Sequence, residues 1–200
     1  MSPFPSPIVL ATRNKHKILE LQTLLAGSGS TFTTLDALGD TVALKEDGST
    51  FRENALLKAR EVYRRTRSIA LADDSGLEVF FLNGRPGVRS ARYAGERATD
   101  EENNEKLLRA MRGVAPRRRH AQFRAVLALV GDGFEEITEG ICPGVLAEAP
   151  RGSNGFGYDP IFVPDGIERT YAELTAEEKN QISHRSRAAR EMRTLLLHPA

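Results

Sequence analysis

The segment spanning residues 68–79 constrains the fold more than any other, because an apolar run there ends abruptly in charged and turn-forming residues. Residues 69–72 are Ile-Ala-Leu-Ala, a short apolar run of the kind that forms a buried strand. The sequence Asp-Asp-Ser-Gly follows at 73–76. Because ligands in open α/β sheets bind beyond the carboxyl ends of strands, this pattern predicts an α/β fold with a ligand site here.

The two adjacent carboxylates, Asp73 and Asp74, suit a hard cation such as Mg²⁺. One of them can also orient or deprotonate a water molecule. The same tetrapeptide is a good turn sequence, however. The segment alone therefore leaves a simple turn and a functional site open as alternatives.

Length and composition restrict the classes of protein that fit. The 200 residues suffice for one sizeable core or for two lobes around a cleft. The 28 Lys and Arg residues oppose 27 Asp and Glu residues, so the charge demands no nucleic-acid or membrane partner. The single cysteine, Cys142, excludes an intrachain disulfide and a cysteine zinc cluster, and it fits a reducing cytoplasm. No apolar run approaches the roughly 18 residues of a membrane span.

Apolar periodicity and capping residues alternate along the chain. Strands are expected at 8–11, 31–35, 69–72, 77–82, 121–130 and 134–139. Helices are expected after the capping residues Asn14, Thr50, Thr99, Thr175 and Ser183. These elements predict an α/β fold with an elongated, mixed, twisted sheet flanked by helices, and two lobes with a central cleft for the ligand. Residues 1–7, rich in proline and without signal-peptide features, are expected to be a disordered leader to a single domain at 8–200.

A basic segment follows the first expected strand and opens the first expected helix. It consists of Thr12, Arg13, Asn14, Lys15, His16 and Lys17. A helix N-terminus offers free N–H groups and a positive dipole end to a phosphate. Basic side chains conflict with that dipole unless an anion binds, which favours a phosphate site over a merely solvated first turn. The glycine-rich P-loop sequence is absent.

A second candidate segment combines two glycines, two aromatic rings and a carboxylate at 154–160. Its expected ligand-binding residues are Phe156, Gly157, Tyr158 and Asp159. Glycine lets the backbone approach a ligand closely, an aromatic ring can stack on a base, and a carboxylate can accept a hydrogen bond from a ring N–H. A tight turn whose aromatic rings pack into the core is an equally good interpretation.

Lys179, His184 and Arg185 lie before and at the start of the last expected helix. Their side chains can donate to a carbonyl or a phosphate, although a solvated helix start is the commoner case. The run at 117–119 is interpreted as a solvated basic loop. The four histidines show no metal-ligand spacing.

Taken together, these segments resemble the inosine/xanthosine triphosphate pyrophosphatase family over residues 8–197. Six of them occur in the family's order: LATRNKHK, EDGSTFRENALLKA, LADDSGLEV, PGVRSARYAG, GFGYDPIF and EEKNQISHRSRA. The resemblance implies a two-lobed α/β homodimer that requires Mg²⁺. It also implies hydrolysis of ITP, dITP and XTP to the nucleoside monophosphate and pyrophosphate, which removes these nucleotides from the pool.

The resemblance also implies roles for individual residues. The segment at 12–17 would bind the triphosphate, Asp74 would be the catalytic base and a metal ligand, and Ser75 would contact substrate. The remaining substrate-binding positions would be Phe156, Gly157, Tyr158, Asp159, Lys179, His184 and Arg185. Asp73 would support the metal.

One departure from the family concerns the metal. Several members carry a metal-binding glutamate three residues before the glycine that matches Gly48, and here that residue is Lys45. Glu46 or Asp47 could supply the missing carboxylate, or the metal could rely on the adjacent acids at 73 and 74.

Two functions from different classes remain. One is the pyrophosphatase, in which water attacks the α-phosphorus and pyrophosphate leaves. The other is a catalytically silent nucleotide- or RNA-binding protein that uses the same basic segment and aromatic rings. Two carboxylates beside a polyanion repel it unless a cation intervenes, so Asp73 and Asp74 favour the enzyme. We therefore expect a purine nucleoside triphosphate as ligand, with no nucleic-acid or membrane partner, in a cytoplasmic homodimer.

Overall fold

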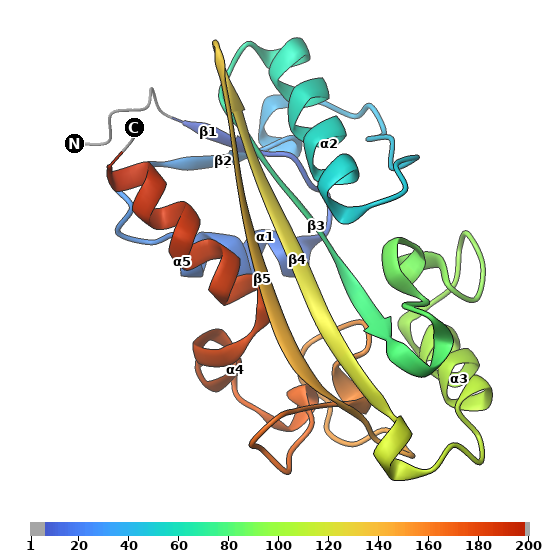
Figure 1. Ribbon diagram of the computed structural model, residues 1–200. Helices are drawn as coiled ribbons and strands as arrows, with labels where there is room; N and C mark the ends of the chain where they lie inside the picture. Colours follow the sequence, from blue (N-terminus) through green and yellow to red (C-terminus); the bar gives the residue numbers. More distant parts are fainter. Residues whose placement is uncertain (1–6, 199–200) are drawn as a thin grey trace. The chain divides into compact units, whose positions relative to one another are not determined.

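The computed structural model describes residues 7–198 and places six strands from this range in one mixed, twisted sheet (Figure 1). The strands are β1 (Ile8–Leu10), β2 (Phe32–Thr34), β3 (Ala70–Val79), β4 (His120–Gly131), β5 (Phe134–Leu146) and β6 (Phe162–Pro164). Their order is β2-β1-β3-β4-β5-β6. Strand β1 is parallel to β2 and β3, whereas β5 is antiparallel to β6. The expected mixed α/β sheet is thus confirmed, and the expected leader lies almost wholly outside the described residues.

Five α-helices occur within the described range. They are α1 (Lys15–Leu24), α2 (Phe51–Thr66), α3 (Asp100–Ala110), α4 (Ala176–Ile182) and α5 (His184–Leu197). Short 3-10 helices lie at Asp36–Leu38, Phe80–Leu82, Gly87–Arg92, Pro116–Arg118, Asp159–Ile161 and Tyr171–Glu173. Thr99 and Thr175 open α3 and α4 with the expected capping boxes. At α2 only half of the expected box forms, because the Glu53 carboxylate accepts from Ser49 instead of from Thr50.

The expected break after residue 72 is wrong, because β3 runs without interruption through Asp-Asp-Ser-Gly. Ser90 keeps this part of the strand extended: its Oγ accepts from Leu77 N at 2.9 Å and donates to Gly87 O at 2.6 Å. A Cβ on Gly76 would lie only 2.4 Å from that Oγ, so glycine is needed for this close approach. Tertiary contacts therefore override a turn-like composition. In the same way, β5 continues to Leu146 rather than ending near Glu139.

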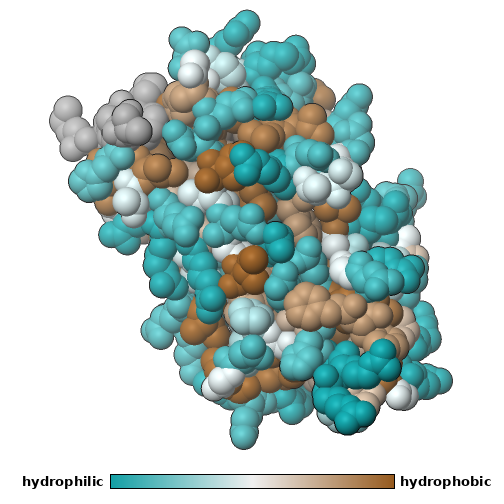
Figure 2. Space-filling model, viewed as in Figure 1, coloured by the Kyte–Doolittle hydropathy of each residue, from teal (hydrophilic) through white to brown (hydrophobic). Residues whose placement is uncertain are grey.

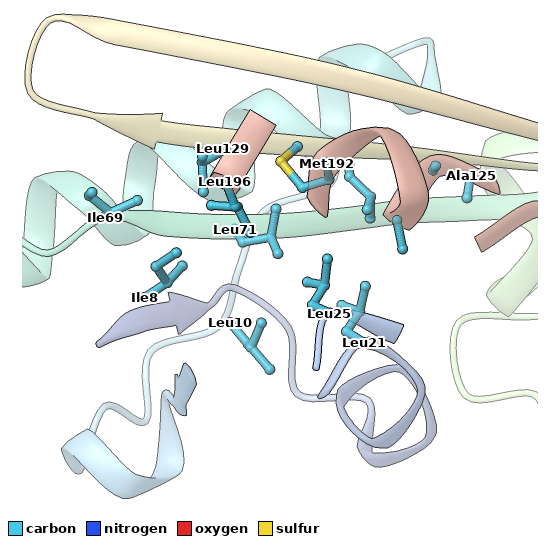
Figure 3. Packing of buried hydrophobic residues seen from close by; sticks show 13 residues of the cluster. Ile8, Leu10, Leu21, Leu25, Ile69, Leu71, Ala125, Leu129, Met192 and Leu196 are labelled. Carbon is cyan, nitrogen blue, oxygen red and sulfur yellow. The ribbon is translucent and has the colours of Figure 1, made fainter. Parts of the chain in front are cut away.

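The chain divides into two compact units. Within the described residues, the first comprises 7–74, 125–140 and 185–198, and the second comprises 75–124 and 141–184. In the first unit, a buried apolar cluster joins β1, α1 and α5 to the neighbouring strands (Figure 3). Its members include Ile8, Leu10, Leu21, Leu25, Leu71, Leu129, Met192 and Leu196. Removing this apolar area from water stabilises the unit and fixes α1 at the end of β1.

The second unit has its own core, which is rich in aromatic side chains. Phe123 packs edge-on against Phe162, with ring centroids 4.8 Å apart, and stacks on Tyr171 at 5.7 Å. Leu77 and Val79 of β3 join the same cluster. This core holds the loops of the second unit that carry the aromatic candidate residues.

The surface is largely hydrophilic on the face drawn in Figure 2, and its hydrophobic residues form small patches. Large exposed apolar side chains are Leu19, Leu38, Val42, Leu57, Phe80 and Leu197. Among residues 7–198, no helix has the length and apolar character that crossing a membrane requires.

Candidate active site

The two adjacent aspartates lie at the carboxyl end of β1 rather than at the end of their own strand. Strand β1 pairs in parallel with β3 at Ala70 and Leu71, and Ala11 N donates to Leu71 O at 2.8 Å. Beyond this point β1 has ended and the chain turns toward α1, while β3 continues. The sheet edge that binds ligands in α/β proteins therefore presents Asp73 and Asp74 from the middle of β3.

Asp73 is a fully buried anchor for two cations. Its Oδ1 lies 2.6 Å from Lys17 Nζ, and its Oδ2 accepts from Arg185 Nε at 2.8 Å. Arg185 is itself only 1% exposed and also pairs with Glu20. Burial alone would raise the pKa of Asp73, but Arg185 and Lys17 hold that pKa well below its usual range. Asp73 therefore remains ionised and organises its neighbours.

Asp74 lies in a different environment. Its Oδ1 accepts from Lys58 Nζ at 2.8 Å, and the same ammonium donates to Glu46 Oε1 at 2.7 Å and to the carbonyl of Asp73 at 2.8 Å. Burial raises the pKa of Asp74, and Lys58 offsets this effect only in part. A carboxylate with a raised pKa accepts protons more readily, which suits a general base. The pKa values of the two adjacent acids thus shift in opposite directions, and this difference suits them to different roles.

The carboxylates of Asp74 and Glu46 fit the oxygen chemistry of Mg²⁺. Both lie within hydrogen-bond distance of one buried ammonium, and Mg²⁺ is held by one or two carboxylates together with waters and substrate phosphates. Within 7–198, no group of three or more His, Cys, Asp or Glu side chains could hold a metal ion. The protein donors would therefore be two carboxylates, completed by substrate.

Among the neighbouring residues 45–47, Glu46 is the one whose carboxylate meets Lys58. Exposure alternates along the segment: Leu44, Glu46 and Gly48 are partly buried, whereas Lys45 and Asp47 are exposed. The alternation gives a structural basis for Glu46 as the metal carboxylate, although metal binding by Glu46, Asp74 or Asp73 stays a prediction.

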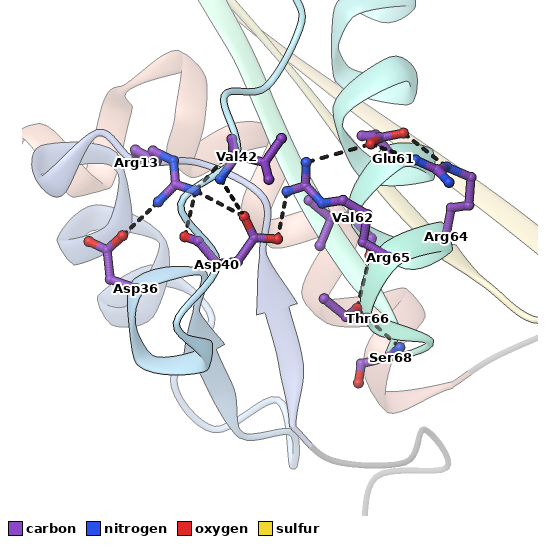
Figure 4. A network of polar contacts seen from close by, with 10 residues as sticks. All are labelled: Arg13, Asp36, Asp40, Val42, Glu61, Val62, Arg64, Arg65, Thr66 and Ser68. Carbon is purple, nitrogen blue, oxygen red and sulfur yellow. Dashed lines mark hydrogen bonds and ion pairs between the residues drawn. The ribbon is translucent and has the colours of Figure 1, made fainter.

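The basic segment at 12–17 has one exposed and one internal part. Asn14 caps α1 through Lys17 N at 3.1 Å, and its own N–H donates to the buried Thr12 Oγ1 at 3.2 Å. Lys15 and His16 are exposed in the first turn of α1, where a phosphate would bind. Arg13 instead points to Asp36 and to the backbone around residue 40 (Figure 4).

In the second unit, Lys179 and Asp159 hold the aromatic loop. Lys179 Nζ lies 2.6 Å from Asp159 Oδ2, which also accepts from Phe156 N at 3.0 Å. Gly155 has a φ of 75°, and a Cβ there would lie 2.0 Å from that carboxylate. The ammonium of Lys179 lies 4.9 Å from the centroid of the half-buried Phe156 ring. The Phe156 ring is thereby held beside the ammonium of Lys179.

The neighbouring residues of this loop have structural partners. Tyr158 is buried and donates its hydroxyl to Ser90 O at 2.8 Å, and burial raises its pKa. Gly157 N donates to Asp100 Oδ2 at 2.6 Å, and Gly157 O accepts from Asn104 Nδ2 at 2.8 Å. For Tyr158 the structure favours the alternative of a ring packed into the core.

The last three candidate residues lie next to the sequence boundaries of the two units. Ser75 follows Asp74 on β3 and is half-buried. His184 is buried and stacks on Phe123, with centroids 4.6 Å apart. Arg185 uses its guanidinium for two carboxylates, which assigns it a positioning role. Direct substrate contact by these three residues stays a prediction.

Sequence reasoning missed Lys58, although a signal existed. The buried face of α2 contains Phe51, Asn54, Ala55, Lys58, Ala59 and Val62. A lysine within a largely apolar helical face needs a buried anionic partner. Its partner, Asp74, lies 16 residues away, and periodicity alone could not have identified it.

An α/β protein in which a lysine from the first turn of a helix meets a buried aspartate has the arrangement expected of the class that handles phosphorylated ligands. Residues 8–195 match the Ham1 family, and the chain belongs to that family. It is 45% identical to the dITP/XTP pyrophosphatase of Bacillus subtilis, over 94% of this chain and 96% of the relative. The dITP/XTP pyrophosphatase of Frankia alni is 51% identical, over 94% and 96%. The solved structure of a HAM1 protein from Coxiella burnetii matches with a TM-score of 0.86 at 45% identity, covering 94% of this chain and 97% of that one.

Proposed function

We propose that this protein hydrolyses the deaminated purine nucleotides ITP, dITP and XTP to the nucleoside monophosphate and pyrophosphate. The observation that carries the proposal is the arrangement of the two adjacent acids: Asp73 is held by Lys17 and Arg185, whereas Asp74 meets Lys58, which also binds Glu46. The names of the relatives support the same activity. This reaction removes non-standard nucleotides from the pool.

The proposed reaction is an in-line displacement at the α-phosphorus. Lys15 and the N-terminus of α1 bind the phosphate tail, and Lys17 adds charge while Asp73 orients it. Asp74 accepts a proton from the attacking water as the new P–O bond forms, and the bond to the bridging oxygen of pyrophosphate breaks. Mg²⁺ held by Asp74 and Glu46 would neutralise charge on the phosphate oxygens.

Selection of the base rests on hydrogen-bond polarity. Hypoxanthine and xanthine carry a carbonyl at C6 and an N–H at N1, whereas adenine has the opposite polarity at both positions. A donor such as His184 facing the amino group of adenine is mismatched, and each such buried mismatch costs about 1–3 kcal/mol. Phe156 stacks on any purine and adds affinity without selecting among them.

Phosphorus NMR of the products formed from ITP tests the proposal. Inosine monophosphate and pyrophosphate are expected, and only with a divalent cation present. Inosine diphosphate and orthophosphate as primary products would refute attack at the α-phosphorus. Tight binding of ITP without turnover would instead favour the alternative of a silent nucleotide-binding protein.

Assembly and location complete the proposal. A homodimer is proposed from the family resemblance, and sedimentation of the purified protein tests it. A cytoplasmic location, with nucleoside triphosphates rather than nucleic acids as ligands, is proposed on the same basis, and fractionation of cells tests it.

A further inference from the structure

The segment 39–50, here the Glu46 loop, has neither helix nor strand. It connects the 3-10 helix at Asp36–Leu38 to α2 and carries the carboxylate that meets Lys58. A segment without a backbone hydrogen-bond ladder depends on side chains to hold its position. The position of Glu46 therefore depends on the side chains that hold this loop.

Asp40 holds the beginning of the loop between two arginines (Figure 4). Its Oδ1 accepts from Arg13 Nη2 at 3.1 Å and from Val42 N at 2.9 Å. Its Oδ2 lies 2.8 Å from Arg65 Nη2, in the last turn of α2. The side chain of Asp40 is only 13% exposed, so these charge-assisted contacts are little screened by water.

Arg13 adds direct contacts to the backbone of the loop. Its Nη2 donates to the carbonyls of Asp40 at 2.6 Å and of Val42 at 3.0 Å, and its Nη1 donates to Asp36 Oδ1 at 2.7 Å. The planar, rigid guanidinium makes these contacts at once and leaves the backbone little freedom. Arg13 also belongs to the basic segment at 12–17, so one side chain joins that segment to the Glu46 loop.

The other end of the loop is held by α2. Gly48 N donates to Asn54 Oδ1 at 2.8 Å, and a Cβ on Gly48 would lie only 2.8 Å from that same oxygen. With both ends held, Glu46 faces inward while Lys45 and Asp47 are exposed. A shift by one residue would present Lys45 to Lys58, with repulsion in place of an ion pair.

We propose that Asp40, which is bound by Arg13 and Arg65, is a positioning residue for Glu46, the carboxylate proposed to bind the metal. It sets the register in which the loop presents Glu46 to Lys58 and Asp74. The inference rests on the proposed function for its link to Mg²⁺, but the restraint on the loop does not depend on that function.

Hydrogen exchange measured by mass spectrometry tests the restraint. Asp40→Asn keeps the shape of the side chain and removes its charge. The amide of Val42, whose N–H donates to Asp40 Oδ1, should exchange roughly tenfold faster in this variant, while the amides in the middle of α2 exchange as in wild type. The matched control is Asp132→Asn, because Asp132 is exposed in the turn between β4 and β5 and should leave exchange as in wild type. Unchanged exchange in Asp40→Asn would overturn the proposal.

Magnesium titrations of ITP hydrolysis test the link to the metal. Asp40→Asn should raise the half-saturating Mg²⁺ concentration roughly tenfold with kcat at saturating Mg²⁺ nearly unchanged, and Asp40→Glu should restore part of the loss. Should Asp40→Asn fold poorly, Arg65→Gln removes the same ion pair from the other side. Faster exchange with an unchanged Mg²⁺ requirement would overturn the positioning role. Absence of ITP hydrolysis by wild type would refute the proposed function and leave the exchange result to decide the restraint.

Discussion

Replacing Lys58 by Met should destabilise the protein in a pH-dependent way. The ammonium of Lys58 is buried and donates to Glu46, to Asp74 and to the carbonyl of Asp73. Removing one partner of a buried ion pair costs about 3–5 kcal/mol, and we take about 3 kcal/mol here because Glu46 is partly exposed. For a chain of this length that loss corresponds to a decrease in Tm of roughly 6–12 °C at neutral pH.

The sign of the pH dependence follows from Asp74. Its pKa is raised in the folded protein, mainly by burial, so the folded state binds more protons than the unfolded chain and stability falls as pH rises. Loss of Lys58 raises that pKa further. The penalty should therefore be small below the folded-state pKa of Asp74 in wild type, which lies above the ordinary carboxyl value, and grow with pH until the still higher pKa of the variant is passed.

Thermal unfolding of wild type and Lys58→Met between pH 4 and pH 8 measures the effect. Lys15→Met is the matched control, since Lys15 is exposed and its loss should change Tm little at any pH. A Tm decrease that is the same at both ends of this range would refute the argument from Asp74. A Lys58→Met protein as stable as wild type would refute the burial argument itself.

Further predictions concern turnover and the metal. Asp74→Asn should lower kcat by roughly 10²-fold or more in a protein that still folds, and it should lower Tm less than Asp73→Asn does, because Lys58 keeps Glu46 as a partner whereas Arg185 and Lys17 both lose the charge of Asp73. Kinetics and melting decide, and normal turnover in folded Asp74→Asn would place the base elsewhere. Phe156→Ala should raise KM for ITP and ATP by the same factor, and a changed ratio would contradict a purely stacking role. Glu46→Gln should raise the Mg²⁺ requirement more than Lys45→Ala, and equal titration curves would exclude Glu46. Wild type should prefer ITP to ATP by a factor on the order of 10² in kcat/KM, and equal values would refute the base-selection argument.

Local patterns determined much of the secondary structure. The capping boxes at Thr99 and Thr175 and the cap at Asn14 form as predicted, because each depends on residues three positions apart. The turn at 132–133 joins β4 to its neighbour β5 for a similar reason. The strand through 73–76 could not be predicted in this way. Its composition favours a turn, and only the packing of Ser90 against Gly76 and the neighbouring strands keeps it extended.

The sequence by itself singled out the adjacent carboxylates and the basic helix start as candidate functional features. Only the tertiary structure decided which charges surround each of the two acids. Asp73 meets Arg185 across 112 residues of sequence, and Asp74 meets Lys58 across 16. A helix cap depends on residues within one turn of the chain. The pKa of a carboxyl, in contrast, depends on burial and on charges brought from distant segments. Identical residue types at 73 and 74 therefore acquire opposite shifts, which no local pattern encodes.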